Sequence, residues 1–212
     1  MKLPLKVPCV CGHTVSFSTY GDEALPRVTC PECGFSTDVI DPLSVSVTGE
    51  RLLYRSKAEL EDGDYSLSIM IGAIAVESFL TRLFLKLKGM DSYATTFTLP
   101  TPVQEEAWER EYPRSGGFTG PADFVSKAIT GMAFDEFVSG NTVAVKIMAG
   151  LPDAPHPSAK QYFQDELFKR RNRIVHWGYV NSAKAEAQLC HTLAMAAVSI
   201  LREMDKSKYG AL

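Results

Sequence analysis

The spacing of hydrophobic positions along this chain changes near residue 50. Before that point, the stretches 14–20 and 34–40 alternate between apolar and polar residues, which is the period-two pattern of half-buried strands. After it, apolar residues recur three and four positions apart, which is the period of amphipathic helices. The pattern therefore predicts a small β region over residues 1–42, ended by Asp41-Pro42, and an all-α bundle over residues 50–206.

Capping and breaking residues indicate where individual helices begin and end. Asp64 is a candidate N-cap for a long helix over residues 65–88, and Gly89 would end it. The middle of this helix is apolar almost all round, which is typical of the central helix of a bundle. Further helices are expected over residues 158–175 and 181–204, with shorter ones near 103–111 and 121–130 and an irregular or short-helical middle.

Composition narrows the class of protein. The chain has 212 residues, 45% of them hydrophobic and 22% charged, as in an ordinary globular protein. The balance of 22 basic against 25 acidic residues excludes a uniformly basic nucleic-acid-binding protein but not a local basic site. No signal peptide is recognisable, and the apolar run 69–76 is too short to span a bilayer, so a cytoplasmic location is expected.

Four of the 5 cysteines form two pairs near the N-terminus, Cys9/Cys11 and Cys30/Cys33, and a glycine follows each pair. A thiolate metal site uses two such tight turns, and glycine relieves the backbone where each turn bends back. A segment of about 40 residues with few large apolar side chains usually needs a metal or disulfides to fold. The four cysteines therefore predict one structural Zn²⁺ ion.

Two knuckles joined by short strands resemble a zinc ribbon. The ligand set keeps one alternative, because a single residue separates Cys9 from Cys11 where two are usual. His13 could take the place of either cysteine. The fifth cysteine, Cys190, lies in an apolar helical pattern, and we expect it to pack in the core.

A run of basic residues, KRRNR over 169–173, ends the helix expected at 158–175. Within it, Arg171 and Asn172 are followed after three residues by His176. This spacing resembles the R-x4-6-H motif of the HEPN superfamily, in which a polar residue often follows the arginine. The order of elements agrees as well, because the motif ends one helix and an alanine- and leucine-rich helix follows. The resemblance covers residues 50–206.

The resemblance implies a metal-independent endoribonuclease that acts as a homodimer, as in toxin–antitoxin and phage-defence systems. On a straight helix Arg171 and His176 lie about 140° apart, so one chain does not align them. In the family, the motifs of two chains build one cleft, which here implies Arg171, Asn172 and His176 from both chains. RNA would be the substrate, with His176 as acid or base and Arg171 on phosphate oxygens. A toxic enzyme would also require an inhibitory partner protein.

Other residues of the chain would lie around this cleft. Lys169, Arg170 and Arg173 would surround it with positive charge and bind RNA phosphates. Glu77, a carboxylate inside an apolar stripe, should pair with a cation, either orienting an arginine of the motif or forming a structural ion pair. Trp177 could stack on a base or pack in the core.

Two further interpretations of the motif stay open. His176 lies beside Gly178, a candidate helix C-cap, so this histidine could cap the helix end while the basic residues form a solvated face. Alternatively, the bundle could be a non-catalytic module that binds a nucleotide, RNA or a protein, with the zinc ribbon as a structural addition.

Overall fold

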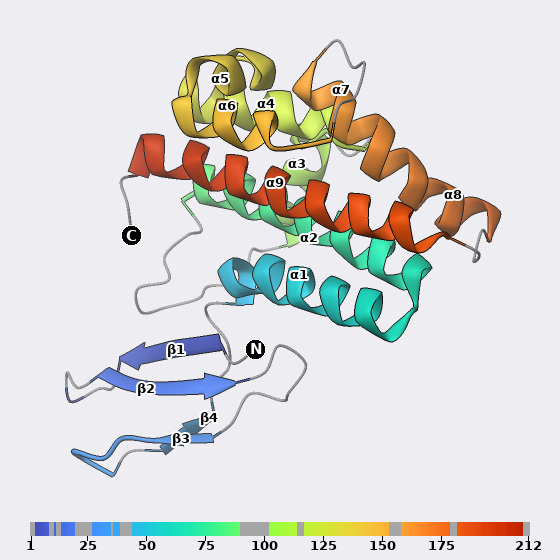
Figure 1. Ribbon diagram of the computed structural model, residues 1–212. Helices are drawn as coiled ribbons and strands as arrows, with labels where there is room; N and C mark the ends of the chain where they lie inside the picture. The colour runs from blue at the N-terminus through green and yellow to red at the C-terminus, as the bar shows by residue number, and fades with distance from the viewer. Residues whose placement is uncertain are drawn as a thin grey trace.

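The computed structural model of this chain describes residues 3–8, 11, 14–19, 27–34, 36–38, 44–89, 102–113, 117–152, 158–178 and 182–209. Two antiparallel strand pairs form its N-terminal part (Figure 1). β1 (Leu3–Pro8) pairs with β2 (Thr14–Thr19), and β3 (Arg27–Thr29) pairs with β4 (Ser36–Asp38). β2 and β4 fall within the two stretches in which the alternating pattern predicts strands.

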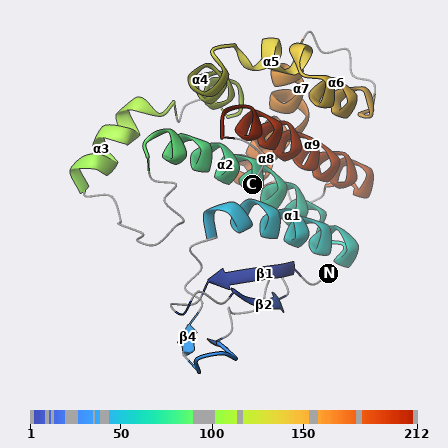
Figure 2. The same cartoon turned by 90° about the vertical axis from the view of Figure 1, so that its left-hand side faces the viewer.

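The described residues from Ser44 onward fold as an all-α bundle, as the helical period predicts. α1 (Ser44–Asp62), α2 (Tyr65–Leu87) and α9 (Lys184–Tyr209) lie side by side in Figures 1 and 2. Between α2 and α9 the chain forms α3 (Pro102–Glu111), α4 (Thr119–Thr130), α5 (Phe134–Gly140), α6 (Thr142–Ala149), α7 (Ala159–Phe163) and α8 (Lys169–Trp177). The short helices α5 and α6 occupy the middle that was expected to be irregular or short-helical.

α2 is the central helix and packs against α1, α9, α8 and α4. Asp64 caps it, since Asp64 Oδ1 accepts a 3.0 Å hydrogen bond from the backbone N–H of Leu67. Within the part of the chain that the structure describes, α2 is the one helix with the length and composition to cross a membrane. Its apolar residues are largely buried in the bundle; they include Ile69, Ala73, Val76, Phe79, Leu80 and Leu83.

α3 projects to one side of the bundle in Figure 2. Its C-terminal end is attached to the end of α2, because Lys88 Nζ lies 2.5 Å from a carboxylate oxygen of Glu111. The next residue, Tyr112, places its ring 4.8 Å from that of Phe84. These contacts fix where the chain returns to the bundle after α3.

The helical region begins earlier than the sequence pattern indicated. α1 starts at Ser44, ahead of residue 50, because packing against α2 overrides the strand-like alternation of residues 44–48. Gly49 permits the close approach of the two helices. A Cβ at Gly49 would lie 3.3 Å from the carbonyl oxygen of Ala75 and 3.4 Å from the Phe79 ring. At the other end, α9 continues to Tyr209, beyond the expected end at residue 204.

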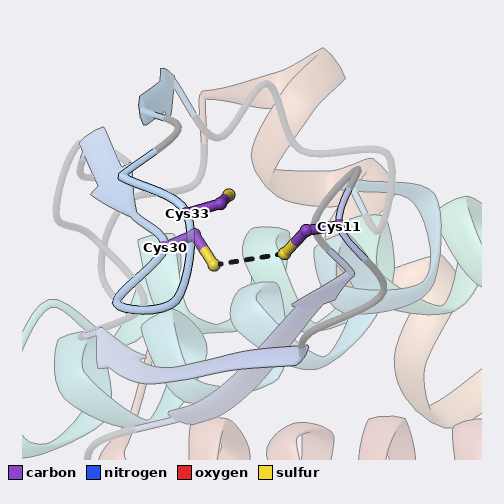
Figure 3. A group of neighbouring side chains, drawn as sticks. All are labelled: Cys11, Cys30 and Cys33. Carbon is purple, nitrogen blue, oxygen red and sulfur yellow. Dashed lines mark hydrogen bonds between the residues drawn. The ribbon is translucent and has the colours of Figure 1, made fainter.

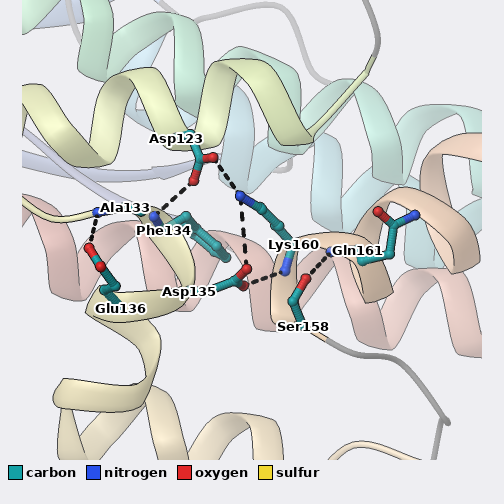
Figure 4. A network of polar contacts seen from close by, with 8 residues as sticks. All are labelled: Asp123, Ala133, Phe134, Asp135, Glu136, Ser158, Lys160 and Gln161. Carbon is teal, nitrogen blue, oxygen red and sulfur yellow. Dashed lines mark hydrogen bonds and ion pairs between the residues drawn. The ribbon is translucent and has the colours of Figure 1, made fainter.

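Acidic side chains join α4, α5 and α7 (Figure 4). Asp123 of α4 accepts hydrogen bonds from Lys160 Nζ at 2.5 Å and from the backbone N–H of Phe134 at 3.0 Å. Asp135 of α5 accepts a 2.9 Å hydrogen bond from the backbone N–H of Lys160. The hydroxyl of Ser158 caps α7. This network fixes the point at which the helix carrying the basic motif begins.

Candidate functional site

The helix that carries the motif is interrupted by a π-helical turn, η1 (Gln164–Phe168), which joins α7 to α8. In an α-helix, residues five apart point about 140° away from each other, whereas i→i+5 bonding winds more slowly and brings them toward one side. Phe163 and Phe168 both face the core as a result, with ring centroids 5.3 and 5.6 Å from that of Phe118. The π turn therefore sets the rotation of α8 relative to the core.

Arg170 hydrogen-bonds to the backbone of this π turn. Its Nη1 donates a 3.1 Å hydrogen bond to the carbonyl oxygen of Glu166. Its guanidinium also pairs with the carboxylates of Glu166 at 2.6 Å and of Glu186, on α9, at 3.0 Å. These contacts give Arg170 a structural role at the junction of α8 and α9, beside the phosphate-binding role that its sequence context suggested.

Cys190 packs against the same π turn. It is buried, as its place in the apolar pattern predicts, and its thiol donates to the carbonyl oxygen of Glu166 at 3.4 Å. Burial raises the pKa of the Cys190 thiol to about 11. A thiol of this kind is inert, so Cys190 contributes packing rather than chemistry.

The motif arginine is held from the inner side of α8. Arg171 Nη2 lies 3.3 Å from Glu77 Oε2 on α2, and Arg171 Nη1 donates a 2.9 Å hydrogen bond to Asn172 Oδ1. The structure therefore brings together three of the residues that the sequence singled out. Glu77 has the cation partner that a carboxylate in an apolar stripe requires.

Glu77 is partly buried, and burial affects the pKa of its carboxyl more than the charge of Arg171 does. Burial raises the pKa of Glu77 above its usual range, and the positive charge of Arg171 lowers it only in part. A carboxylate whose pKa is higher in the folded state disfavours folding when it is ionised. The raised pKa therefore gives no support to a stabilising role for the ionised Glu77 carboxylate.

We expect Glu77→Gln to alter how stability depends on pH. Because the folded-state pKa of Glu77 lies above the unfolded value of about 4.5, wild-type stability relative to the variant is highest below that pH and falls as pH rises through the folded pKa. Denaturant unfolding of both proteins between about pH 4 and pH 7 measures the difference. A wild-type advantage that grows with pH would contradict this assignment.

The outer face of α8 carries a different set of side chains. Arg173, His176 and Trp177 are all exposed, and their spacing of three and four residues places them on one face of the last turn. Neither Arg173 nor His176 has a hydrogen bond or ion pair with the residues that the structure describes. Gly178, left-handed at φ 61°, ends α8, and its N–H donates to the Ile174 carbonyl at 3.1 Å.

One chain does not bring the arginine and the histidine together. α8 is α-helical from Lys169 to Trp177. At about 100° per residue, the five steps from Arg171 to His176 therefore place the two side chains about 140° apart around the helix axis. Arg171 faces α2, whereas His176 faces outward. Asn172 precedes His176 by one turn and is bonded to Arg171, so it lies between the two.

The basic run carries less uncompensated charge than the sequence suggested. Lys169 pairs with Asp165 at 2.5 Å, and Arg170 and Arg171 pair with glutamates. Within the described part of the chain, Arg173 is the cation of this run without an acidic partner. The local excess of positive charge is therefore concentrated at Arg173.

Sequence reasoning missed the acids that compensate this charge. Asp165 and Glu166 each precede a basic residue by four positions, which is the spacing of a helical ion pair and could have been recognised. Glu186 lies on another helix, so no local spacing pointed to it.

The N-terminal cysteines form a second site (Figure 3). The sulfurs of Cys11 and Cys30 are 3.7 Å apart, and those of Cys11, Cys30 and Cys33 all lie within 4.8 Å of one another. In a tetrahedral thiolate site with Zn–S bonds of about 2.3 Å, the sulfurs are about 3.8 Å apart. The three cysteines can therefore hold a metal ion.

The second knuckle has the backbone that a metal-binding turn needs. The Gly34 N–H donates a 2.9 Å hydrogen bond to the Cys30 carbonyl, and Gly34 adopts a φ of 70°, which glycine tolerates without strain. Cys30 is buried, while Cys33 is exposed. Cys9 and the alternative ligand His13 lie outside the described residues.

A scan of protein-family models, a search of curated proteins and a search of solved structures each return no match to this chain. Function is therefore inferred from the two sites themselves.

Proposed function

We propose that this protein is a metal-independent endoribonuclease of the HEPN type, acting on RNA as a homodimer. The observation that carries the proposal is that Arg171 and His176 lie on different sides of α8. Arg171 is oriented from the inner side by Glu77 and Asn172, while His176 stands exposed on the outer side. An oriented guanidinium suits phosphate oxygens, and an exposed imidazole suits proton transfer.

The separation of Arg171 and His176 supports a site built from two chains. Two copies of α8 that meet across a two-fold axis can place Arg171 of one copy opposite His176 of the other, and the reverse. The last turn of α8 is available for such a meeting, since Val175, one turn after Arg171, is exposed as well. The single cleft between them would then hold Arg171, Asn172 and His176 from both subunits.

The reaction follows from these groups. One His176 removes the proton of the ribose 2′-hydroxyl, and the resulting oxygen forms a bond to the adjacent phosphorus. The bond from phosphorus to the 5′-oxygen breaks, and the same His176, now protonated, returns the proton to that leaving oxygen. Arg171 stabilises the charge that develops on the phosphate. The products are a 2′,3′-cyclic phosphate and a 5′-hydroxyl.

The cysteine cluster is proposed to hold one structural Zn²⁺ ion in a zinc ribbon, with Cys9 as the fourth ligand. Four thiolates fill a tetrahedral site, so the ion supports folding and takes no part in cleavage. The ribbon can then serve as a docking element for RNA or for a protein. Reduced thiolates suit a cytoplasmic location. An enzyme that cuts cellular RNA also needs control, which makes an inhibitory partner, as in toxin–antitoxin or phage-defence systems, part of the proposal.

A second candidate is a non-catalytic module that binds RNA or a nucleotide. The observation that favours it is the pairing of Lys169, Arg170 and Arg171 with acids. Little positive charge then remains to stabilise a phosphorane, which is more negative than the ground-state phosphate that a binding module has to hold. Tight binding without cleavage would identify this function.

The decisive assay incubates purified protein with single-stranded RNA in excess EDTA. The proposal predicts that cleavage persists, because no chemical step uses a metal ion, and that the products carry 2′,3′-cyclic phosphate ends. RNA whose 2′-hydroxyls are methylated is the matched control and should stay intact, because its nucleophile is blocked. Products with 3′-hydroxyl ends, or cleavage that requires added Mg²⁺, would contradict the proposal.

A further inference from the structure

Trp177 is the large apolar side chain most exposed among the described residues, at 84%. An indole ring is usually mostly buried, because it removes a large apolar area from water. Here the last turn of α8 exposes the Trp177 ring to solvent. Packing in the core of this chain therefore does not account for a tryptophan at this position. Trp177 therefore either meets a ligand or meets another protein surface.

The neighbours of Trp177 favour a ligand that carries both an aromatic ring and a negative charge. Arg173 lies four residues before Trp177 and His176 lies beside it, so both share the exposed face with the indole. Arg173 is the cation of the basic run that no described acid compensates. An aromatic platform beside an uncompensated guanidinium is the combination that holds single-stranded nucleic acid, with bases stacked on the ring and phosphates on the cation.

We infer that the outer face of α8 binds one unpaired nucleotide, with its base stacked on Trp177 and its phosphate on Arg173. The inference rests on the proposed function and deepens it, because the stacked nucleotide would lie next to His176. A base within a duplex cannot reach the indole, since both of its faces are already stacked. The site therefore selects an unpaired base at this position.

Tryptophan fluorescence tests this directly, because the chain has 2 tryptophans. Trp108→Phe leaves Trp177 as the single indole, and Trp177→Phe is the matched control that retains Trp108. Each protein is titrated with a short 2′-O-methyl RNA, which binds but cannot be cleaved, with the same strand in duplex form, and with an abasic strand of equal charge.

Stacking predicts that the single strand quenches Trp177 fluorescence in the Trp108→Phe protein, while the duplex and the abasic strand do not. Trp177→Ala should weaken binding of the single strand by about 5- to 140-fold, the factor equivalent to roughly 1–3 kcal/mol for one stacked base. Binding without quenching, or equal affinity for the abasic strand, overturns the inference. Loss of the dimer in Trp177→Ala also overturns it, because Trp177 would then pack against the second copy.

Failure here is distinguishable from failure of the proposed function. Quenching by 2′-O-methyl RNA together with no cleavage of ordinary RNA would keep the nucleotide site and reject the ribonuclease. Cleavage of ordinary RNA without quenching would do the reverse.

Discussion

Replacing His176 with alanine is expected to lower the rate of RNA cleavage about 10²- to 10⁴-fold, the usual contribution of a positioned acid or base. The same change should leave folding nearly untouched, within about 0.5 kcal/mol, because the side chain is exposed and has no bond to the described residues. Single-turnover cleavage and thermal unfolding of the purified variant measure the two quantities.

The matched control for this variant is His156→Ala, which removes a histidine outside the motif. It should cleave RNA at the wild-type rate. A His176 variant that keeps full activity, or that loses activity only because it unfolds, would remove this residue from the chemistry.

Removing a cysteine of the N-terminal cluster is the second change with a large expected effect. Cys30→Ser should lose about one equivalent of bound zinc, because Cys30 is the buried ligand of the cluster and its sulfur lies 3.7 Å from that of Cys11. Structural zinc sites supply the folding free energy of small domains, so the hairpins of residues 1–42 should become sensitive to protease. The helical circular dichroism should persist, since the hydrophobic core cluster of the bundle consists of residues after position 44.

Cys190→Ala is the matched control for this change, because it removes a buried cysteine that belongs to the bundle. It should retain all of the bound metal. Less than about half an equivalent of metal in the wild-type protein, or full retention of metal in Cys30→Ser, would contradict the metal site.

Periodicity and caps predicted the framework of the bundle well. The α2 helix runs from Tyr65 to Leu87, next to the expected 65–88, because its cap at Asp64 and its apolar run are both local features. The helical region was expected from residue 50, whereas α1 begins at Ser44 and approaches α2 closely at Gly49, a contact that no local sequence pattern indicates. The π turn at Gln164–Phe168 was missed for the same reason, because two phenylalanines meet a third from another helix there.

The site could be anticipated in part. A carboxylate in an apolar run predicted a cation partner for Glu77, and the structure identifies that partner as Arg171. The sequence did not indicate that Arg170 is used at the π turn, because Glu186 approaches it from α9. Where a residue's role depends on a neighbouring helix, the sequence pattern could single out the residue, but only the fold identifies its partner.

Mixing two inactive variants tests most directly the central claim, that the cleft is built from the α8 motifs of two chains. Arg171→Ala and His176→Ala homodimers should each be nearly inactive in EDTA. When subunits are exchanged between them, mixed dimers regain cleavage, because one subunit supplies the arginine and the other the histidine. Differently tagged subunits verify that mixed dimers have formed. Mixed dimers that form and remain as inactive as the two parents would contradict the composite site.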